Sequence, residues 1–221
     1  MPKTALVTGA NRGIGLEICR QLVERGDHVI AACRSVSNGL TALDVRVEEG
    51  VDVSSEESVA HLVRRLGGEP IDWLVNNAGI LTRETLSSMD YEAVRLQFEV
   101  NAMGPLRITH ALLPQLGPGS KVGIVSSRMG SLEDNTSGSR YGYRMSKAAV
   151  NMAGISLAHD LKDRGVAVAL LHPGYVQTDM TGGRGNVQPE EAASGLIARM
   201  DGLSMDNTGS FWHANGEKLP W

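Results

Sequence analysis

The stretch that decides the fold is Thr8-Gly9-Ala10-Asn11-Arg12-Gly13-Ile14-Gly15, which links the apolar run Ala5-Leu6-Val7 to an amphipathic segment over 14–25. We expect a strand, a tight turn and a helix, the arrangement in which a dinucleotide pyrophosphate rests on a helix N-terminus. Gly9 would permit the turn, Gly13 would let phosphates approach the backbone, and Gly15 would let the helix pack closely. The spacing is GxxxGxG and not GxGxxG, so alone it also fits a glycine-rich turn without a ligand.

Short apolar runs alternate with helical patterns along the rest of the chain. Further strands are expected at 28–32, 51–53, 71–75, 122–125, 166–171 and 209–212, and helices at 14–25, 54–66, 90–114, 142–162 and from 189 onward. The weakest signal lies in 35–50. Continuous apolar strands separated by helices indicate a parallel sheet covered on both faces. We therefore predict an α/β fold, with a single Rossmann-type doubly wound domain over 1–221.

Composition excludes several classes of protein. Hydrophobic residues make up 42% of the 221, enough for a buried core, and the net charge of −4 with 4% aromatics argues against a nucleic-acid partner. No apolar run approaches the ~20 residues of a membrane span, and the N-terminus does not resemble a signal peptide. We expect Cys19 and Cys33 to be buried, reduced thiols, and the histidines lack metal-ligand spacing. The expectation is a cytoplasmic protein without a metal or membrane contact.

The end of the second expected strand bears on cofactor choice. Folds that bind NAD carry an acid there, about 20 residues after the glycines, but Ala32-Cys33-Arg34-Ser35 has none. Arg34, with Arg12 reaching from the other side, would suit a 2′-phosphate, so we predict NADPH rather than NADH. A solvated loop cation is the alternative for Arg34.

A carboxylate after the third expected strand could accept a hydrogen bond from the adenine amino group. Asp52, followed by Val53, is the first choice because a capped helix follows directly. Asp44 is a weaker alternative.

Three polar segments follow the later strands. They are Asn76-Asn77-Ala78-Gly79, Ser126-Ser127 and, on the next helix, Tyr143-Arg144-Met145-Ser146-Lys147. Because Tyr143 and Lys147 are four residues apart, they share a helix face. We expect this face to look onto the crevice at the carboxyl edge of the sheet.

In this order the motifs resemble the short-chain dehydrogenase/reductase family of the classical type. The resemblance runs from Lys3 to about Met180, through TGxxxGIG (8–15), NNAG (76–79), Asn101, Ser127, YxxxK (143–147) and Pro173-Gly174. The 134–136 loop, the 143–147 segment and the ending Gly216-Glu217-Lys218-Leu219-Pro220-Trp221 look most like the C-factor and sniffer-type carbonyl reductase branch.

The resemblance implies a role for each catalytic residue. Tyr143 would be the general acid in carbonyl reduction, or the base in alcohol oxidation, and Lys147 would lower its pKa and hold the nicotinamide ribose. Ser127 would hydrogen-bond the substrate oxygen, and Asn101 would anchor a water in a proton relay. Ser126 competes with Ser127, but Ser127 stands three residues before a glycine, as is usual in the family.

The resemblance also implies the cofactor contacts. Thr178 matches the position that bonds the nicotinamide carboxamide, and Val176 would offer its backbone. Asn76 and Gly79 are the expected adenosine-side contacts, and Asn77 is a contact or a structural amide. The full predicted set is Gly9, Asn11, Arg12, Gly13, Ile14, Gly15, Arg34, Asp52, Val53, Asn77, Ala78, Gly79, Tyr143, Lys147, Pro173, Gly174, Val176 and Thr178.

Two segments depart from the family pattern. The stretch between Ser127 and Tyr143 is long and polar, and the substrate lid over about 179–189 is short and glycine-rich. The expected pocket walls are apolar, which favours a hydrophobic carbonyl substrate: Leu81, Met129, Leu132, Tyr175 and Met180.

The predicted function is therefore NADPH-dependent reduction of a ketone, aldehyde or quinone. One alternative is a cofactor-binding regulatory protein of the C-factor type, and another is an NAD-dependent alcohol dehydrogenase. Because the family pairs subunits through the helices expected at 90–114 and 142–162, a homodimer or homotetramer is also expected.

Overall fold

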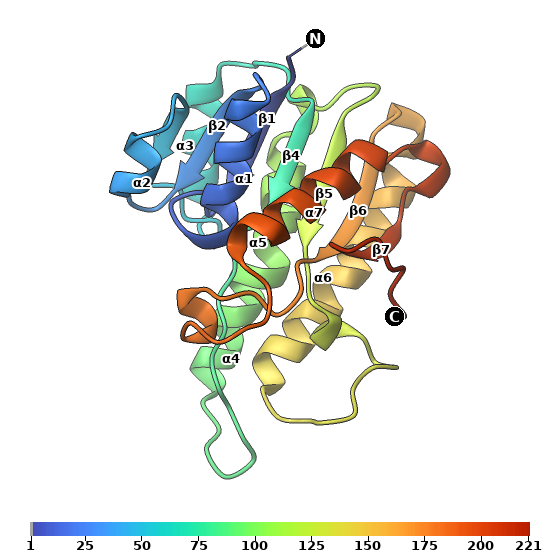
Figure 1. The fold of residues 1–221 in the computed structure, drawn as a ribbon. Coiled ribbons are helices and arrows are strands. Elements are labelled where there is room, and N and C mark those ends of the chain that lie inside the picture. Colours follow the sequence, from blue (N-terminus) through green and yellow to red (C-terminus); the bar gives the residue numbers. More distant parts are fainter. Residues whose placement is uncertain (1) are drawn as a thin grey trace.

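Across residues 2–221, which the computed structural model describes, seven parallel strands form one sheet in the order β3-β2-β1-β4-β5-β6-β7. The strands are β1 Thr4–Thr8, β2 His28–Cys33, β3 Arg46–Glu49, β4 Trp73–Asn76, β5 Lys121–Val125, β6 Ala167–His172 and β7 Ser210–His213. The α-helices are α1 Gly13–Glu24, α2 Asn38–Thr41, α3 Glu56–Leu66, α4 Tyr91–Phe98, α5 Gly104–Ala111, α6 Tyr141–Asp160 and α7 Pro189–Gly202. Figure 1 shows the strands running to a common carboxyl edge. The predicted doubly wound sheet is confirmed.

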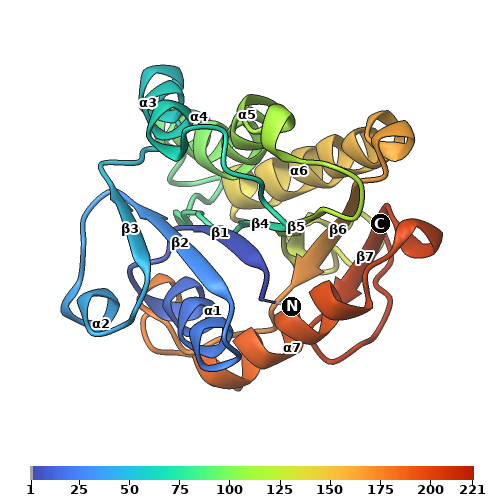
Figure 2. The same cartoon turned by 90° about the horizontal axis from the view of Figure 1, so that it is seen from above.

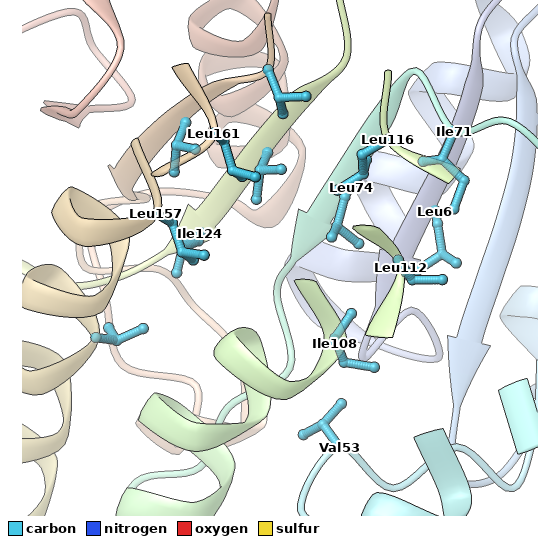
Figure 3. Close-up of a cluster of buried hydrophobic side chains, with 14 of the residues drawn as sticks. Leu6, Val53, Ile71, Leu74, Ile108, Leu112, Leu116, Ile124, Leu157 and Leu161 are labelled. Carbon is cyan, nitrogen blue, oxygen red and sulfur yellow. The ribbon is translucent and has the colours of Figure 1, made fainter. Parts of the chain in front are cut away.

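Helices cover both faces of the sheet, with α1 and α7 on one side and α3 to α6 on the other (Figure 2). Successive side chains of each strand point to opposite faces of the sheet. In β1, Leu6 joins the core under α3, α5 and α6, whereas Ala5 and Val7 join the core under α1 and α7. Figure 3 shows the first core, where Leu74 and Ile124 of the sheet lie near Ile108 and Leu157 of the helices. Because both faces of the sheet are buried by helices, the strands are continuous apolar runs in the sequence.

Strand β3 lies earlier than predicted, within the stretch of weakest signal. Its sequence is Arg46-Val47-Glu48-Glu49, and the buried Glu48 pairs with Arg46 at 2.8 Å and with Arg65 at 2.5 Å. A charged strand at the sheet edge resists pairing with other chains, but it has no apolar run to detect. The segment that we expected to be the strand, 51–53, instead leads out of the carboxyl edge.

The helix expected over 90–114 is interrupted by a π-turn at Glu99–Met103, between α4 and α5. Pro105 has no N–H and so cannot donate to the carbonyl of Asn101, four residues earlier. A Cβ at Gly104 would lie 2.9 Å from Val53 Cγ2, so this end of α5 packs close to the loop after β3. Single π-turns within helices occur frequently at functional sites.

The helices that follow the neighbouring strands β1 and β4 lie on opposite faces of the sheet. This opens a crevice at the carboxyl ends of the two strands. The segments that follow β1, β4, β5 and β6 all begin at this edge (Figure 1). No helix within residues 2–221 is long and apolar enough to cross a membrane.

Candidate active site

A cleft of about 590 Å³ opens at the carboxyl edge of the sheet, from the turn after β1 to α6. Most of the predicted cofactor residues line it: Gly9, Asn11, Arg12, Gly13, Ile14, Gly15, Arg34, Asp52, Val53, Asn77, Ala78, Gly79, Tyr143, Lys147, Pro173 and Thr178. Gly174 and Val176 lie outside this lining. Val176 is only 3% exposed, and its carbonyl accepts a hydrogen bond from Thr181 Oγ1 at 2.8 Å.

The N-terminus of α1 is open to the cleft. Its N-cap residue, Arg12, makes no side-chain cap, and the first turn carries no acid, so the helix offers free N–H groups and a positive end. The turn is held tightly because Asn77 Nδ2 donates to the carbonyls of Thr8 and Gly9 at 3.0 and 3.2 Å. A Cβ at Gly15 would lie 2.3 Å from the Gly9 carbonyl oxygen. The turn therefore has the form of a rigid anion cradle.

The two asparagines after β4 have separate places. Asn76 is 2% exposed, and its Nδ2 donates to Thr109 Oγ1 of α5 at 3.1 Å. Asn76 lies outside the cleft lining, so the expectation that it contacts the cofactor is wrong; it is buried against α5 instead. Asn77 is a structural amide of the turn and also borders the cleft.

The far end of the cleft carries one cation and one carboxylate. Asp52 Oδ1 accepts from the Ser54 N–H at 2.9 Å and from Ser54 Oγ at 2.6 Å. These hydrogen bonds, with help from the charges of Arg34 and Arg107, lower the pKa of Asp52 and keep it an ionised acceptor. Arg34 is exposed and borders the same end. Asp44 precedes β3 and lies outside the cleft lining, so that alternative is wrong.

Arg12 does not stand free beside Arg34 as predicted. Its Nη1 lies 3.2 Å from Asp179 Oδ2, so an ion pair joins the turn after β1 to the segment after β6. The two segments also touch where a Cβ at Gly13 would lie 3.3 Å from Thr178 Cγ2. Asp179 lines the cleft and was missed from sequence, where its only signal is that it follows Thr178.

Tyr143 and Lys147 of α6 form the other end of the cleft. The 4%-exposed Lys147 donates from Nζ to the Val125 carbonyl at 2.8 Å, and its Nζ lies 5.7 Å from the centre of the Tyr143 ring. Burial lowers the pKa of Lys147 to about 8. Burial also raises the pKa of Tyr143, while a hydrogen bond with Ser127 and the charge of Arg140 act in the opposite direction. A protonated phenol and an amine able to change charge near neutral pH therefore meet here.

The two serines after β5 differ in what engages their hydroxyls. Ser126 borders the cleft, but its Oγ donates to Asn151 Oδ1 at 2.5 Å. Ser127 lies just outside the cleft lining, accepts from the Met129 N–H at 3.1 Å, and is hydrogen-bonded to Tyr143. The Ser127 hydroxyl is therefore the one beside the phenol.

Asn101 is fully buried in the π-turn, and its side chain is fully used. Oδ1 accepts from the Ile80 N–H at 2.8 Å, and Nδ2 donates to the Ile80 carbonyl at 2.9 Å and to Ser146 Oγ at 3.1 Å. A Cβ at Gly79 would lie 3.2 Å from Asn101 Oδ1 and 3.8 Å from Lys147 Nζ. The asparagine and the lysine therefore flank the same glycine.

Two of the predicted pocket walls lie elsewhere. Met129 and Leu132 line a separate hollow of about 170 Å³, together with Tyr141 and Met145. Tyr141 and Met145 stand on a different face of α6 from Tyr143 and Lys147, so this hollow does not open on the phenol. Of the five predicted walls, Met180 alone lines the cleft.

Comparison with known proteins agrees with this geometry. A family model for short chain dehydrogenases matches residues 3–188. The 1-hydroxy-2-glutathionyl-2-methyl-3-butene dehydrogenase of Rhodococcus sp. (strain AD45) is 48% identical over 99% of both chains. The C-signal protein of Myxococcus xanthus is 44% identical over 69% of this chain and 93% of its own. The NADPH-bound carbonyl reductase from chicken fatty liver superposes with a TM-score of 0.91 at 27% identity, covering 100% of this chain and 99% of that one. The chain is an oxidoreductase that belongs to the short-chain dehydrogenase family.

Proposed function

We propose that this protein transfers a hydride between NADP(H) and a carbonyl or alcohol substrate, and that its main reaction is reduction of a ketone, aldehyde or quinone. One observation carries the proposal: a single cleft joins the Arg34 and Asp52 end to the Tyr143 and Lys147 end. The NADPH-bound chicken carbonyl reductase, which has the same fold, supports this choice of cofactor and reaction.

The residues of the cleft suit each part of a dinucleotide. The open N-terminus of α1 would hold the pyrophosphate, and the glycine backbone beside it leaves the room that phosphates need. Arg34 would pair with a 2′-phosphate, and Asp52 would accept from the adenine amino group. Thr178 would bond the carboxamide, and Lys147 would hold the nicotinamide ribose. When bound, the cofactor supplies a hydride to a carbonyl carbon or accepts one from an alcohol.

The chain's own part is to orient the substrate oxygen and move one proton. The raised pKa keeps the Tyr143 phenol protonated, which suits donation from Oη to that oxygen. Ser127 Oγ would donate a hydrogen bond to the same oxygen, and the Lys147 ammonium would stabilise the phenolate that remains. The Asn101 carbonyl, which lacks a donor at Pro105, would hold a water leading to Lys147.

Two further proposals concern the surroundings of the cleft. The segment 179–189 would act as a short lid, which Arg12 and Asp179 tie to the turn after β1. Large apolar side chains exposed on the helices would pair subunits as a homodimer or homotetramer; they are Tyr91, Leu96, Met103, Leu106, Met145 and Met152.

A second candidate is alcohol oxidation, which would use the same residues in the reverse direction. The Rhodococcus relative is a dehydrogenase of a hydroxyl compound that carries a glutathionyl group, and it matches over 99% of both chains. The likeness to C-signal keeps a regulatory role as the alternative from a different class.

Turnover of a panel of aldehydes, ketones, quinones and primary alcohols tests these proposals. Each compound is assayed with NADP(H) and NAD(H), with wild-type protein and Tyr143→Phe in parallel. We expect carbonyl reduction with NADPH that the variant loses while it still binds NADPH. Oxidation of alcohols alone would favour the second candidate, and cofactor binding without any turnover would favour the regulatory role.

A further inference from the structure

The ending Gly216–Trp221, which the motifs above leave without a role, folds back along β7. Lys218 bridges Trp212 in antiparallel fashion, and the Leu219 N–H donates to the Phe211 carbonyl at 2.8 Å. In Figure 1 this red end of the chain lies beside β7, on the side where the yellow-green 131–140 loop begins. The segment is therefore a fixed part of the sheet edge.

Trp221 binds the start of the 131–140 loop through its main chain. Its main-chain oxygen accepts from Ser131 Oγ at 3.0 Å, from the Leu132 N–H at 3.0 Å and from the Glu133 N–H at 3.1 Å. Its ring stacks on the fully buried Phe211, with centroids 5.4 Å apart and planes inclined by 25°. The stack anchors the acceptor to the core, so three donors of the loop meet a fixed atom.

A second tie reaches the residue after Ser127. Arg128 pairs with Glu217 at 2.9 Å and with Asp134 at 2.9 Å. The same short segment therefore holds Arg128 through Glu217 and residues 131–133 through Trp221, and Arg128 directly follows the serine whose hydroxyl contacts Tyr143.

The remaining ties of the loop lie mainly at its far end, where Arg144 binds Ser137 Oγ at 2.8 Å and the Arg140 N–H donates to the Glu84 carbonyl at 2.9 Å. Most of 132–139 is exposed and has no regular structure. Arg144 of α6 binds its far end, through the carbonyls of Gly138 and Ser139 at 3.1 and 3.2 Å. Without the anchor at Trp221, the Leu132 and Glu133 amides would lose their acceptor, while the cofactor-binding turns would keep their partners.

We propose that the 216–221 segment positions the substrate side of the active site, and that Trp221 and Glu217 act on carbonyl binding through the 128–134 loop and Ser127. The inference rests on the proposed function and adds to it the control of substrate, as distinct from cofactor, by this segment. Neither residue touches the reacting atoms, so both are positioning residues.

The first test compares Trp221→Ala with Trp221→Phe, which keeps a stacking ring, and with Lys218→Ala, an exposed control on the same segment. Misplacement of about 1 Å at a site can cost up to ~100-fold. For Trp221→Ala we expect the KM for a carbonyl substrate to rise about tenfold and the KM for NADPH to stay within about twofold. Trp221→Phe should restore most of the loss, and Lys218→Ala should resemble the wild type. Equal rises in both KM values would overturn the inference.

Hydrogen exchange gives a readout that does not need turnover. In Trp221→Ala the amides of Leu132 and Glu133 should exchange faster, while those of the 8–16 turn should exchange at their wild-type rates. Ser131→Ala removes one donor to the same oxygen, so its effect on carbonyl KM should be smaller and non-additive with Trp221→Ala. Unchanged exchange in the loop would refute the inference even if the enzyme proved inactive. Faster exchange in Trp221→Ala, combined with no carbonyl turnover by the wild type, would instead support the role of Trp221 as an anchor and contradict the proposed function.

Discussion

Replacing Asp179 by Asn should tighten NADPH binding, although it removes an ion pair. Asp179 borders the cleft and holds the Arg12 guanidinium, with the two side chains 78% and 64% exposed. With NADPH bound as proposed, its carboxylate would repel the cofactor phosphates and would also keep Arg12 from turning toward them. The substitution removes the first effect and relieves the second while keeping the size of the side chain.

The magnitude follows from this exposure. A surface pair of this kind is worth ~0–1 kcal/mol, so the unfolding free energy should change by less than about 1 kcal/mol. We expect the freed Arg12 and the lost repulsion to improve the binding free energy of NADPH by an amount on the same scale. This corresponds to about a two- to fivefold decrease in the Kd for NADPH.

Titration of NADPH fluorescence at low and at high salt measures the effect, with Asp206→Asn as an exposed control on the other side of the fold. The gain should shrink at high salt, where exposed charges are screened. An unchanged or weakened affinity at low salt would refute the reasoning, as would an equal gain in the control.

The remaining predictions concern cofactor choice, pH, packing and assembly. Arg34→Ala should raise the Kd for NADPH about tenfold and leave that for NADH within about twofold in the same titration; equal losses would speak against a 2′-phosphate contact. Because burial lowers the pKa of Lys147 to about 8, the kcat for carbonyl reduction should fall as pH rises through about 8. Since the unfolded chain keeps that proton to higher pH, the unfolding free energy of the cofactor-free protein should rise from about pH 8 toward 10.5. Gly15→Ala should lower the unfolding free energy by about 1–3 kcal/mol in urea, and Gly117→Ala, whose Cβ would meet nothing within 4 Å, should not. Met152→Asp should reduce the mass measured by light scattering to that of a single chain; an unchanged mass would exclude this face of α6 from assembly.

The sequence predicts most of the fold because strands that are buried on both faces of the sheet are apolar along their whole length, which makes them easy to detect. Six of the seven strands are apolar runs, and the helix at Glu56–Leu66 begins after the capping residue Ser55, as expected. The exception, β3, is an edge strand whose buried Glu48 pairs with Arg65, which is 17 residues away. No local pattern encodes such a partner.

The candidate site divides in the same way. Many motif residues line the cleft as predicted, among them Tyr143 and Lys147, whose four-residue spacing puts them on one helix face. A motif does not predict the hydrogen-bond or ion-pair partner of each side chain. The Ser126 hydroxyl donates to Asn151, which is 25 residues away, and Arg12 pairs with Asp179, which is 167 residues away. The spacing to Gly130 favoured Ser127 over Ser126, and the structure adds the reason, because the Ser126 hydroxyl is engaged by Asn151.

Asn101 shows that the fold can give a predicted site residue a structural task that its motif does not reveal. Its amide, the feature that distinguishes an asparagine, is wholly engaged by Ile80 and Ser146. The amide therefore fixes the π-turn against the segment after β4. Pro105 has no N–H to donate to the Asn101 carbonyl four residues earlier, which breaks the α-helical pattern at this position. The side chain of Asn101 thus helps to build the site, and a proton relay through its main chain stays a prediction.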